Sequence, residues 1–152
     1  MPKVGSKTSV CHHVSVLTRE HDRLVSFLTD VLDFKVCYSL KVPSSVLAEL
    51  MGWVLVAPTV RSTLLGDGEA GMVEIVDLAD LPKSANDNPR EPSSGPFQIC
   101  LNVDDLHSTL ERATGADEII GPIELGIGGS TILAGIVSVA GTRFQLTQAG
   151  SS

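Results

Sequence analysis

The sequence predicts an α+β fold in which one strand–helix–three-strand unit occurs twice. Alternating polar and apolar residues over Val10–Thr18 predict a strand, and apolar residues spaced by three and four over Glu20–Leu32 predict an amphipathic helix directly after it. The same order returns later, with a strand over Phe97–Val103 and a helix over Asp104–Ala113. An internal repeat of this kind indicates two copies of one supersecondary unit.

Three more strands complete each copy. In the first copy they are predicted over Phe34–Val42, Thr59–Leu65 and Met72–Leu78. Pro43 is expected to end the first of these, and a short helix capped by a serine is expected over residues 44–51, before Gly52. In the second copy the three strands are predicted over Ile119–Leu125, Thr131–Val139 and Arg143–Thr147.

A polar, proline-rich stretch separates the two copies. Residues 79–96 carry four of the eight prolines and read as a linker that is long for a connection inside a compact domain. The predicted organisation is therefore a first module over residues 9–78, a linker over 79–96 and a second module over 97–148, together forming one structural domain.

Composition excludes several classes of function. The chain has 152 residues and a formal net charge of −7, which repels phosphates and argues against a nucleic-acid partner. No apolar run is long enough to span a bilayer, and the N-terminus lacks the apolar core of a signal peptide, so no membrane partner and a cytoplasmic location are expected. The cysteine count is three, with no Cys-x-x-Cys pair, which predicts reduced core cysteines.

The two copies align at four polar positions. His13-Val-Ser-Val on the first strand of copy one matches Gln98-Ile-Cys-Leu on the first strand of copy two. Val73-Glu-Ile on the last strand of copy one matches Phe144-Gln-Leu on the last strand of copy two. Four polar side chains therefore occupy equivalent places, and they are His13, Glu74, Gln98 and Gln145.

With this repeat in view, the chain resembles the vicinal-oxygen-chelate superfamily, the group of glyoxalase I, bleomycin-resistance proteins and extradiol dioxygenases. The resemblance covers about residues 9 to 148. It rests on His13-Val-Ser-Val followed by Phe27-Leu-Thr-Asp-Val-Leu-Asp-Phe, and on the closing strands Val73-Glu-Ile-Val and Phe144-Gln-Leu-Thr. These motifs specify the superfamily well and the reaction poorly.

The resemblance implies two βαβββ modules that form a half-closed, cup-shaped mixed sheet with the helices on the outside. It also implies a divalent metal in the cup, and carried over by position its ligands are His13, Glu74, Gln98 and Gln145. This set departs from the family's pattern because it holds one carboxylate and two neutral amides. Divalent cations prefer charged oxygen and imidazole donors, so a weakly bound metal or none is expected.

Each site residue has a structural alternative. His13 is either a ligand or general base in the cup, or a histidine hydrogen-bonded inside the fold. Glu74 is either a ligand or a base, because a carboxylate in an apolar strand is costly unless it is paired or used, or it forms a salt bridge with Arg61 or Arg143. Gln98 and Gln145 either orient a substrate oxygen or satisfy neighbouring backbone groups.

Two further residues are expected to contact substrate, Arg61 and Trp53. Trp53, the only tryptophan, lies in a segment over residues 43–58 that either lines the cavity or packs on a second subunit. His21 and His107 lie among charged residues and are expected at the solvated surface.

Two functions follow from the resemblance. The first is an enzyme of the isomerase or lyase type, which acts on a small carbonyl-containing molecule by acid/base chemistry of His13 and Glu74. The second is a protein that binds or sequesters a small molecule without catalysis, similar to bleomycin-resistance proteins. Extradiol ring cleavage is the least expected, because it needs a second histidine. A homodimer is expected from the resemblance, with the site either inside one chain or across two.

Overall fold

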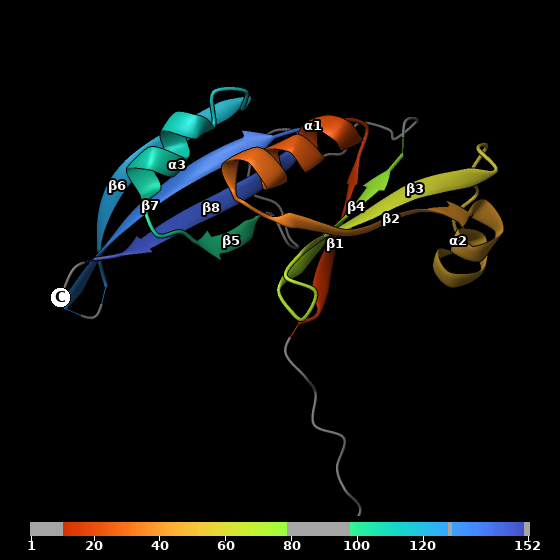
Figure 1. The fold of residues 1–152 in the computed structure, drawn as a ribbon, viewed down its shortest axis with the longest axis horizontal. Helices are drawn as coiled ribbons and strands as arrows, with labels where there is room; N and C mark the ends of the chain where they lie inside the picture. Colours follow the sequence, from red (N-terminus) through yellow and green to blue (C-terminus); the bar gives the residue numbers. More distant parts are fainter. Residues whose placement is uncertain (1–10, 79–97, 128, 151–152) are drawn as a thin grey trace, which may run out of the picture.

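The computed structural model describes residues 11–78, 98–127 and 129–150 of the chain. These residues form two four-stranded mixed sheets (Figure 1). In each module the chain runs through one strand, then a helix, then the three other strands of the sheet. The expected α+β fold of two βαβββ modules is confirmed. The proposed linker over residues 79–96 lies outside the described residues.

The first module has its strands in the order β1-β4-β3-β2, with β1 parallel to β4 and the other neighbours antiparallel. Figure 1 shows α2 at one end of the molecule, far from the second module. The elements are β1 (His13–Thr18), α1 (His21–Ser26) with its continuation η1 (Phe27–Val31), β2 (Lys35–Pro43), α2 (Ser44–Met51), β3 (Thr59–Gly66) and β4 (Met72–Asp77).

The second module repeats this arrangement with the strand order β5-β8-β7-β6, and β5 is parallel to β8. Its helix begins at Asp105, whose carboxylate accepts a hydrogen bond from the Ser108 backbone N–H at 3.0 Å. The elements are β5 (Ile99–Asn102), α3 (Leu106–Arg112), β6 (Glu118–Ile127), β7 (Ser130–Val139) and β8 (Thr142–Ala149).

The helix predicted over residues 20–32 is confirmed, with one local change. Leu24, Phe27 and Leu28 are buried because three- and four-residue spacing puts them on one stripe. From Phe27 the helix widens into the π-helical turn η1, where the Leu32 N–H donates to the Phe27 carbonyl at 3.3 Å. The stripe continues through this turn and ends at the buried Val31.

Two local expectations are wrong. Ser44 does not cap α2, since its hydroxyl donates to the Ala57 carbonyl and Pro43 occupies the cap position without a side-chain bond. The three cysteines are exposed rather than buried. Apolar sequence neighbours do not bury a cysteine in a strand, because the alternate residues face the other side of the sheet.

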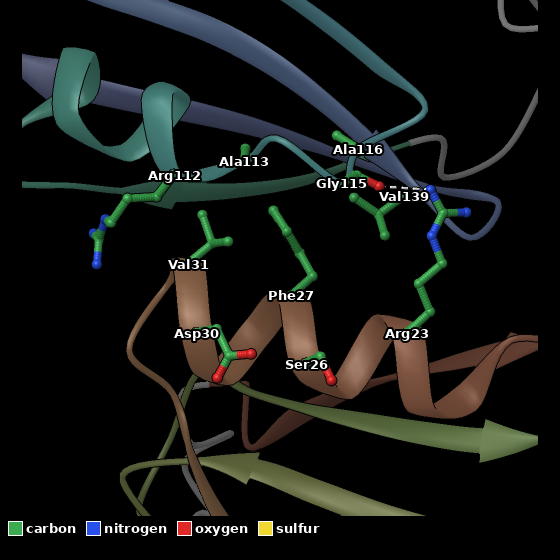
Figure 2. Close-up of a pocket in the computed structure, with 10 residues that line it drawn as sticks. All are labelled: Arg23, Ser26, Phe27, Asp30, Val31, Arg112, Ala113, Gly115, Ala116 and Val139. Atoms are coloured by element: carbon green, nitrogen blue, oxygen red, sulfur yellow. Dashed lines mark hydrogen bonds between the residues drawn. The ribbon is translucent and has the colours of Figure 1, made fainter.

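One apolar core serves both modules. The buried residues of α1 and η1 pack with Val73 and Ile75 of β4 and with Phe144 and Leu146 of β8 in a single cluster. The Phe27 and Phe144 rings lie 5.2 Å apart, centroid to centroid, across the two modules. Figure 2 shows α1 and η1 lying between the strands of the first module and the second module. The helix-facing sides of both sheets are therefore directed toward the same core.

A polar contact closes the edge of this core. Arg23 of α1 donates to both carboxylate oxygens of Asp117, at 2.7 and 3.1 Å, and to the Gly115 carbonyl at 2.7 Å. Asp117 also accepts the Ala140 backbone N–H at 3.1 Å. The hydrogen bond from Arg23 holds the pKa of Asp117 below its ordinary value, and the Ala140 N–H acts in the same direction.

None of the helices in the described part of the chain is long and apolar enough to cross a membrane.

The Arg23–Asp117 contact predicts a pH-dependent contribution to stability. A carboxylate whose pKa is lowered by folding stabilises the folded state above the unfolded pKa of about 3.9, and this contribution is lost as the pH falls through the folded pKa. Because both side chains are partly exposed, we expect D117N to lower the free energy of unfolding by only about 1 kcal/mol at pH 7.

Urea denaturation of D117N and wild type at pH 7 and pH 3 measures this effect, with the exposed Glu124→Gln change as the matched control. The difference between D117N and wild type should shrink at pH 3. An equal difference at both values would contradict the role given to this carboxylate.

Candidate functional site

The first polar pair of the candidate site joins β1 to β4. The Ser15 hydroxyl donates to Glu74 Oε1 at 2.7 Å, and the two residues are direct partners in the parallel register. Glu74 is half-buried, between the fully buried Val73 and Ile75. Since side chains alternate along a strand, Glu74 points to the side of the sheet opposite the core.

The second polar pair lies at the corresponding place in the second module. Gln98, just before β5, donates from Nε2 to Gln145 Oε1 at 2.6 Å. Gln145 pairs in register with Cys100, as Glu74 pairs with Ser15. The two modules thus use the same pair of strands to hold a side-chain hydrogen bond, with an acid in one module and two amides in the other.

Both pairs face away from the shared core. The neighbours of Glu74 along β4 and the neighbours of Gln145 along β8 belong to one apolar cluster. Each sheet consequently has a core side and an outer side, and we call the outer sides the cup faces. The cup face of the first module carries Glu74 and that of the second carries Gln145, with the core and α1 between the two sheets.

His13 shares a cup face with Glu74 but contacts a different partner. It pairs in register with Met72, two residues before Glu74, so both side chains lie on the same side of the sheet. Its ring Nδ1 is 2.7 Å from His12 Nδ1, close enough for one histidine to donate to the other. His13 is exposed, at the start of the edge strand.

The structure does not bring Arg61 to this face. Arg61 lies on the helix-facing side of β3, where its guanidinium contacts Asp22 and Asp77, each at 3.0 Å. Arg143 contacts Glu118 at 3.6 Å. Neither arginine therefore forms the salt bridge with Glu74 that the sequence offers as an alternative.

Trp53 follows α2 in a segment whose Val54 and Val56 side chains are almost fully exposed. Trp53 itself is half-buried. The helix α2, which directly precedes this segment, lies at the end of the molecule away from the second module (Figure 1). A contact with substrate stays a prediction for this residue.

The donor set within one chain does not fit a divalent metal. Across the described ranges, no three His, Cys, Asp or Glu side chains come together in a metal-binding group. The Gln145 amide oxygen already accepts a hydrogen bond from the Gln98 amide. Glu74 supplies a carboxylate on the other face, where it accepts from Ser15. We therefore derive no step of the chemistry through a metal, and the weak site expected from the sequence stays a prediction.

One buried polar residue was missed from the sequence. His21, expected at the surface, is 5% exposed. Its Nε2 lies 2.8 Å from the Thr63 hydroxyl, which in turn is 2.9 Å from the Ser39 hydroxyl, and its Nδ1 lies 3.0 Å from Asp22. The hydrogen bond with His21 is the main cause that lowers the pKa of Asp22. No local signal in the sequence marks His21 as buried, because its partner Thr63 lies on β3, far along the chain.

Two unsatisfied polar atoms lie on the cup faces. Within the described residues, Ser62 Oγ and Arg143 Nε are the buried side-chain nitrogen or oxygen atoms that have no hydrogen-bond partner. Ser62 pairs in register with Val76, two residues beyond Glu74 on the same face. Arg143 precedes Gln145 by two residues on β8, so it shares the second cup face. Buried polar groups are nearly always paired, so these two atoms are exceptions among the described residues.

A separate cleft of about 390 Å³ lies between the helix of the first module and the second module (Figure 2). Phe27 and Val31 form part of its apolar lining, while Arg23 and Arg112 stand at its two ends. Both arginines already contact acids, Asp117 and Asp33 respectively. The cleft belongs to the contact between modules and is not on a cup face.

Comparison with known proteins identifies the fold. No family model and no curated protein matches the sequence. Among solved structures, a glyoxalase family protein from Bacillus cereus aligns with a TM-score of 0.77 over 97% of this chain and 99% of its own, at 16% identity. A glyoxalase family protein from Enterococcus faecalis aligns with a TM-score of 0.62 over 90% of this chain and 94% of its own, at 14% identity.

Glyoxalase I from Zea mays aligns with a TM-score of 0.64 and 16% identity over 94% of this chain, which corresponds to 46% of the maize protein. Likeness at this level of identity concerns the fold. The chain has the fold of the vicinal-oxygen-chelate proteins, as expected from its repeated motifs.

The donor set predicts weak metal binding. After dialysis against a chelator, we expect titration calorimetry with Mn²⁺, Ni²⁺ and Zn²⁺ to give no one-to-one complex in the micromolar range, because one carboxylate and two amides compensate poorly for the lost hydration of the ion.

This expectation would be contradicted if wild type and the surface control E111Q formed a one-to-one complex and both H13A and E74A did not. His13 and Glu74 would then be metal ligands.

Proposed function

We propose that the protein acts on a small carbonyl-containing molecule by acid/base chemistry at Glu74, as an isomerase or lyase. The observation that carries this proposal is the Ser15–Glu74 pair on one cup face and the Gln98–Gln145 pair at the equivalent place on the other. A carboxylate can accept a proton, and an amide N–H can donate to a developing oxyanion. The two faces thus supply complementary halves of one reaction.

In the proposed reaction, Glu74 removes a proton from the carbon next to the substrate carbonyl. The electron pair of the broken C–H bond moves into an enolate, and the negative charge develops on the carbonyl oxygen. The amides of Gln98 and Gln145 donate to that oxygen. Glu74 then returns its proton to carbon, or the enolate expels a leaving group from the neighbouring carbon. The Ser15 hydroxyl orients the carboxylate throughout.

Because the two cup faces of one chain point away from their shared core, we propose that a second copy completes the site. Each cup face ends in exposed apolar side chains on its outer strand. Tyr38 and Leu40 on β2 are 43% and 47% exposed, and Ile123 on β6 is 49% exposed. Apolar surface of this kind commonly marks an interface. In a homodimer, the first module of one copy would face the second module of its partner.

A protein that binds a small molecule without catalysis is the second candidate. It is favoured by the Gln98–Gln145 pair, whose two amides can hold a polar ligand but cannot accept a proton at neutral pH. Under this alternative Glu74 and Ser15 serve only as hydrogen-bonding groups. The cytoplasmic location expected from the sequence stays a prediction under both functions.

Deuterium exchange tests the proposed catalysis without knowledge of the product. We expect wild type to speed the wash-in of solvent deuterium beside the carbonyl of compounds such as hydroxyacetone and 2-oxobutanoate, followed by proton NMR. General-base catalysis contributes about 100-fold or more, so E74Q should lose at least that factor.

The matched control is E111Q, which changes an exposed carboxylate of α3 and should exchange at the wild-type rate. Unchanged exchange in E74Q would remove the base role. Ligand-induced thermal stabilisation of wild type without any exchange would instead support the binding protein.

The proposed dimer predicts that a charge on an outer strand separates the copies. We expect wild type to sediment as a dimer and L40E as a folded monomer, because burial of an unpaired carboxylate in an apolar interface is costly. Analytical ultracentrifugation measures the mass, and circular dichroism checks that the variant is folded.

The control E49Q alters the exposed polar side of α2 and should remain dimeric. A wild-type monomer at all accessible concentrations would contradict a site shared between copies.

A further inference from the structure

Arg143 places a cation on the second cup face. It is the second residue of β8, where it alternates with the buried Phe144 and so shares a side of the sheet with Gln145. Across the sheet it pairs in register with Ser138, which pairs with Glu118. The Arg143 side chain is 22% exposed, so it lies in the surface of the cup and does not extend into solvent.

The guanidinium of Arg143 is poorly satisfied. Its Nε is buried and has no hydrogen-bond partner. In the described part of the chain its nearest acid is Glu118, whose Oε1 lies 3.6 Å from Nη2, beyond a normal hydrogen bond. By contrast, Arg23 reaches Asp117 at 2.7 Å. A guanidinium has five N–H donors. Within the described residues, those of Arg143 have no acceptor as close as the Asp117 carboxylate is to Arg23.

Arg143 lies near the amide pair, two residues before Gln145 on β8. Two residues along a strand span about 7 Å, so the guanidinium and the Gln145 amide are close enough to contact adjacent groups of one small molecule. Gln98 donates to Gln145 from the neighbouring strand. The second cup face therefore combines amides suited to a carbonyl oxygen with a guanidinium suited to an anion.

We propose that the carbonyl compound bound in the cup also carries a carboxylate, and that Arg143 binds this carboxylate through the accessible N–H groups of its guanidinium. This inference rests on the proposed function and names the class of its substrate. The planar guanidinium binds a carboxylate with two parallel hydrogen bonds, which gives orientation as well as affinity. The bound carboxylate would then fix the carbonyl against the amides of Gln98 and Gln145.

Charge favours a carboxylate over a phosphate. The chain carries a net charge of −7, and Glu118 lies beside Arg143, so the local excess of positive charge is at most that of one guanidinium. A carboxylate brings one negative charge, so it adds less repulsion with Glu118 than a more highly charged group would. A phosphate ester brings about 1.5 to 2 negative charges at pH 7 and would leave an excess next to Glu118.

The test compares ligands that differ only in charge. Titration calorimetry measures the binding of 2-oxobutanoate, its methyl ester and its amide to wild type, R143Q and R143K. We expect the acid to bind wild type at least ten times more tightly than the ester or the amide. In R143Q the affinity for the acid should fall at least tenfold, toward that for the ester, while binding of the ester is unchanged. The affinity of R143K for the acid should lie between those of wild type and R143Q. An ammonium keeps the positive charge but cannot form the two parallel hydrogen bonds of a guanidinium.

The matched control is R112Q, which removes an arginine of the second module that pairs with Asp33 away from the cup, and it should bind the acid like wild type. Equal binding of acid and ester by wild type, or unchanged binding of the acid by R143Q, would overturn the inference. A phosphonate analogue that binds more tightly than the acid and depends on Arg143 would overturn the choice of carboxylate. If R143Q does not fold, the affinity of R143K for the acid serves as the comparison, after unfolding curves have shown that R143K is folded.

The failure of this inference is distinguishable from the failure of the proposed function. Deuterium exchange into hydroxyacetone that needs Glu74 but not Arg143, together with equal binding of acid and ester, would leave the proposed function standing and remove the carboxylate. Arg143-dependent binding of the acid, with no exchange into any compound, would support the ligand class and remove the catalysis.

Discussion

The rest of the structure depends on one constraint, the sharing of a single apolar core between the two modules. The stripe on α1 and η1 packs against β4 on one side and β8 on the other, and the contact of Phe27 with Phe144 joins the two. Each fully buried aromatic or aliphatic side chain contributes about 1.5–3 kcal/mol, so the shared cluster outweighs the polar contacts at its edge. Once both sheets are directed toward this core, their other sides must face outward.

This outward direction explains the character of the candidate site. The same alternation that buries Val73 and Ile75 turns Glu74 to the cup face, and the same rule applies to Gln145 between Phe144 and Leu146. At these positions the two modules carry different groups. One copy holds a hydroxyl and a carboxylate, while the other holds two amides beside a guanidinium, so a site that joins both faces is chemically asymmetric although the folds are alike.

Much of this could be predicted from periodicity, and the failures have physical causes. The strands and both module helices follow from the spacing of apolar residues, because burial of one face imposes that spacing. His21 was placed at the surface because its sequence neighbours are charged, whereas its burial depends on Thr63, which lies 42 residues further along the chain. The position of Arg61 on β3 directs it to the acids at the start of α1 and at the end of β4, a contact that no local pattern indicates.

By itself the sequence determined the repeat, the order of strands and helices, and which face of each strand carries the polar residues, because these depend on local spacing and on comparison of the two copies. Only the tertiary structure decided that the helix-facing sides of both sheets share one core and that the polar pairs therefore lie on outer faces. It also decided that Arg143 Nε has no hydrogen-bond partner within the described residues. Those facts depend on contacts between residues far apart in the chain, which no local pattern encodes.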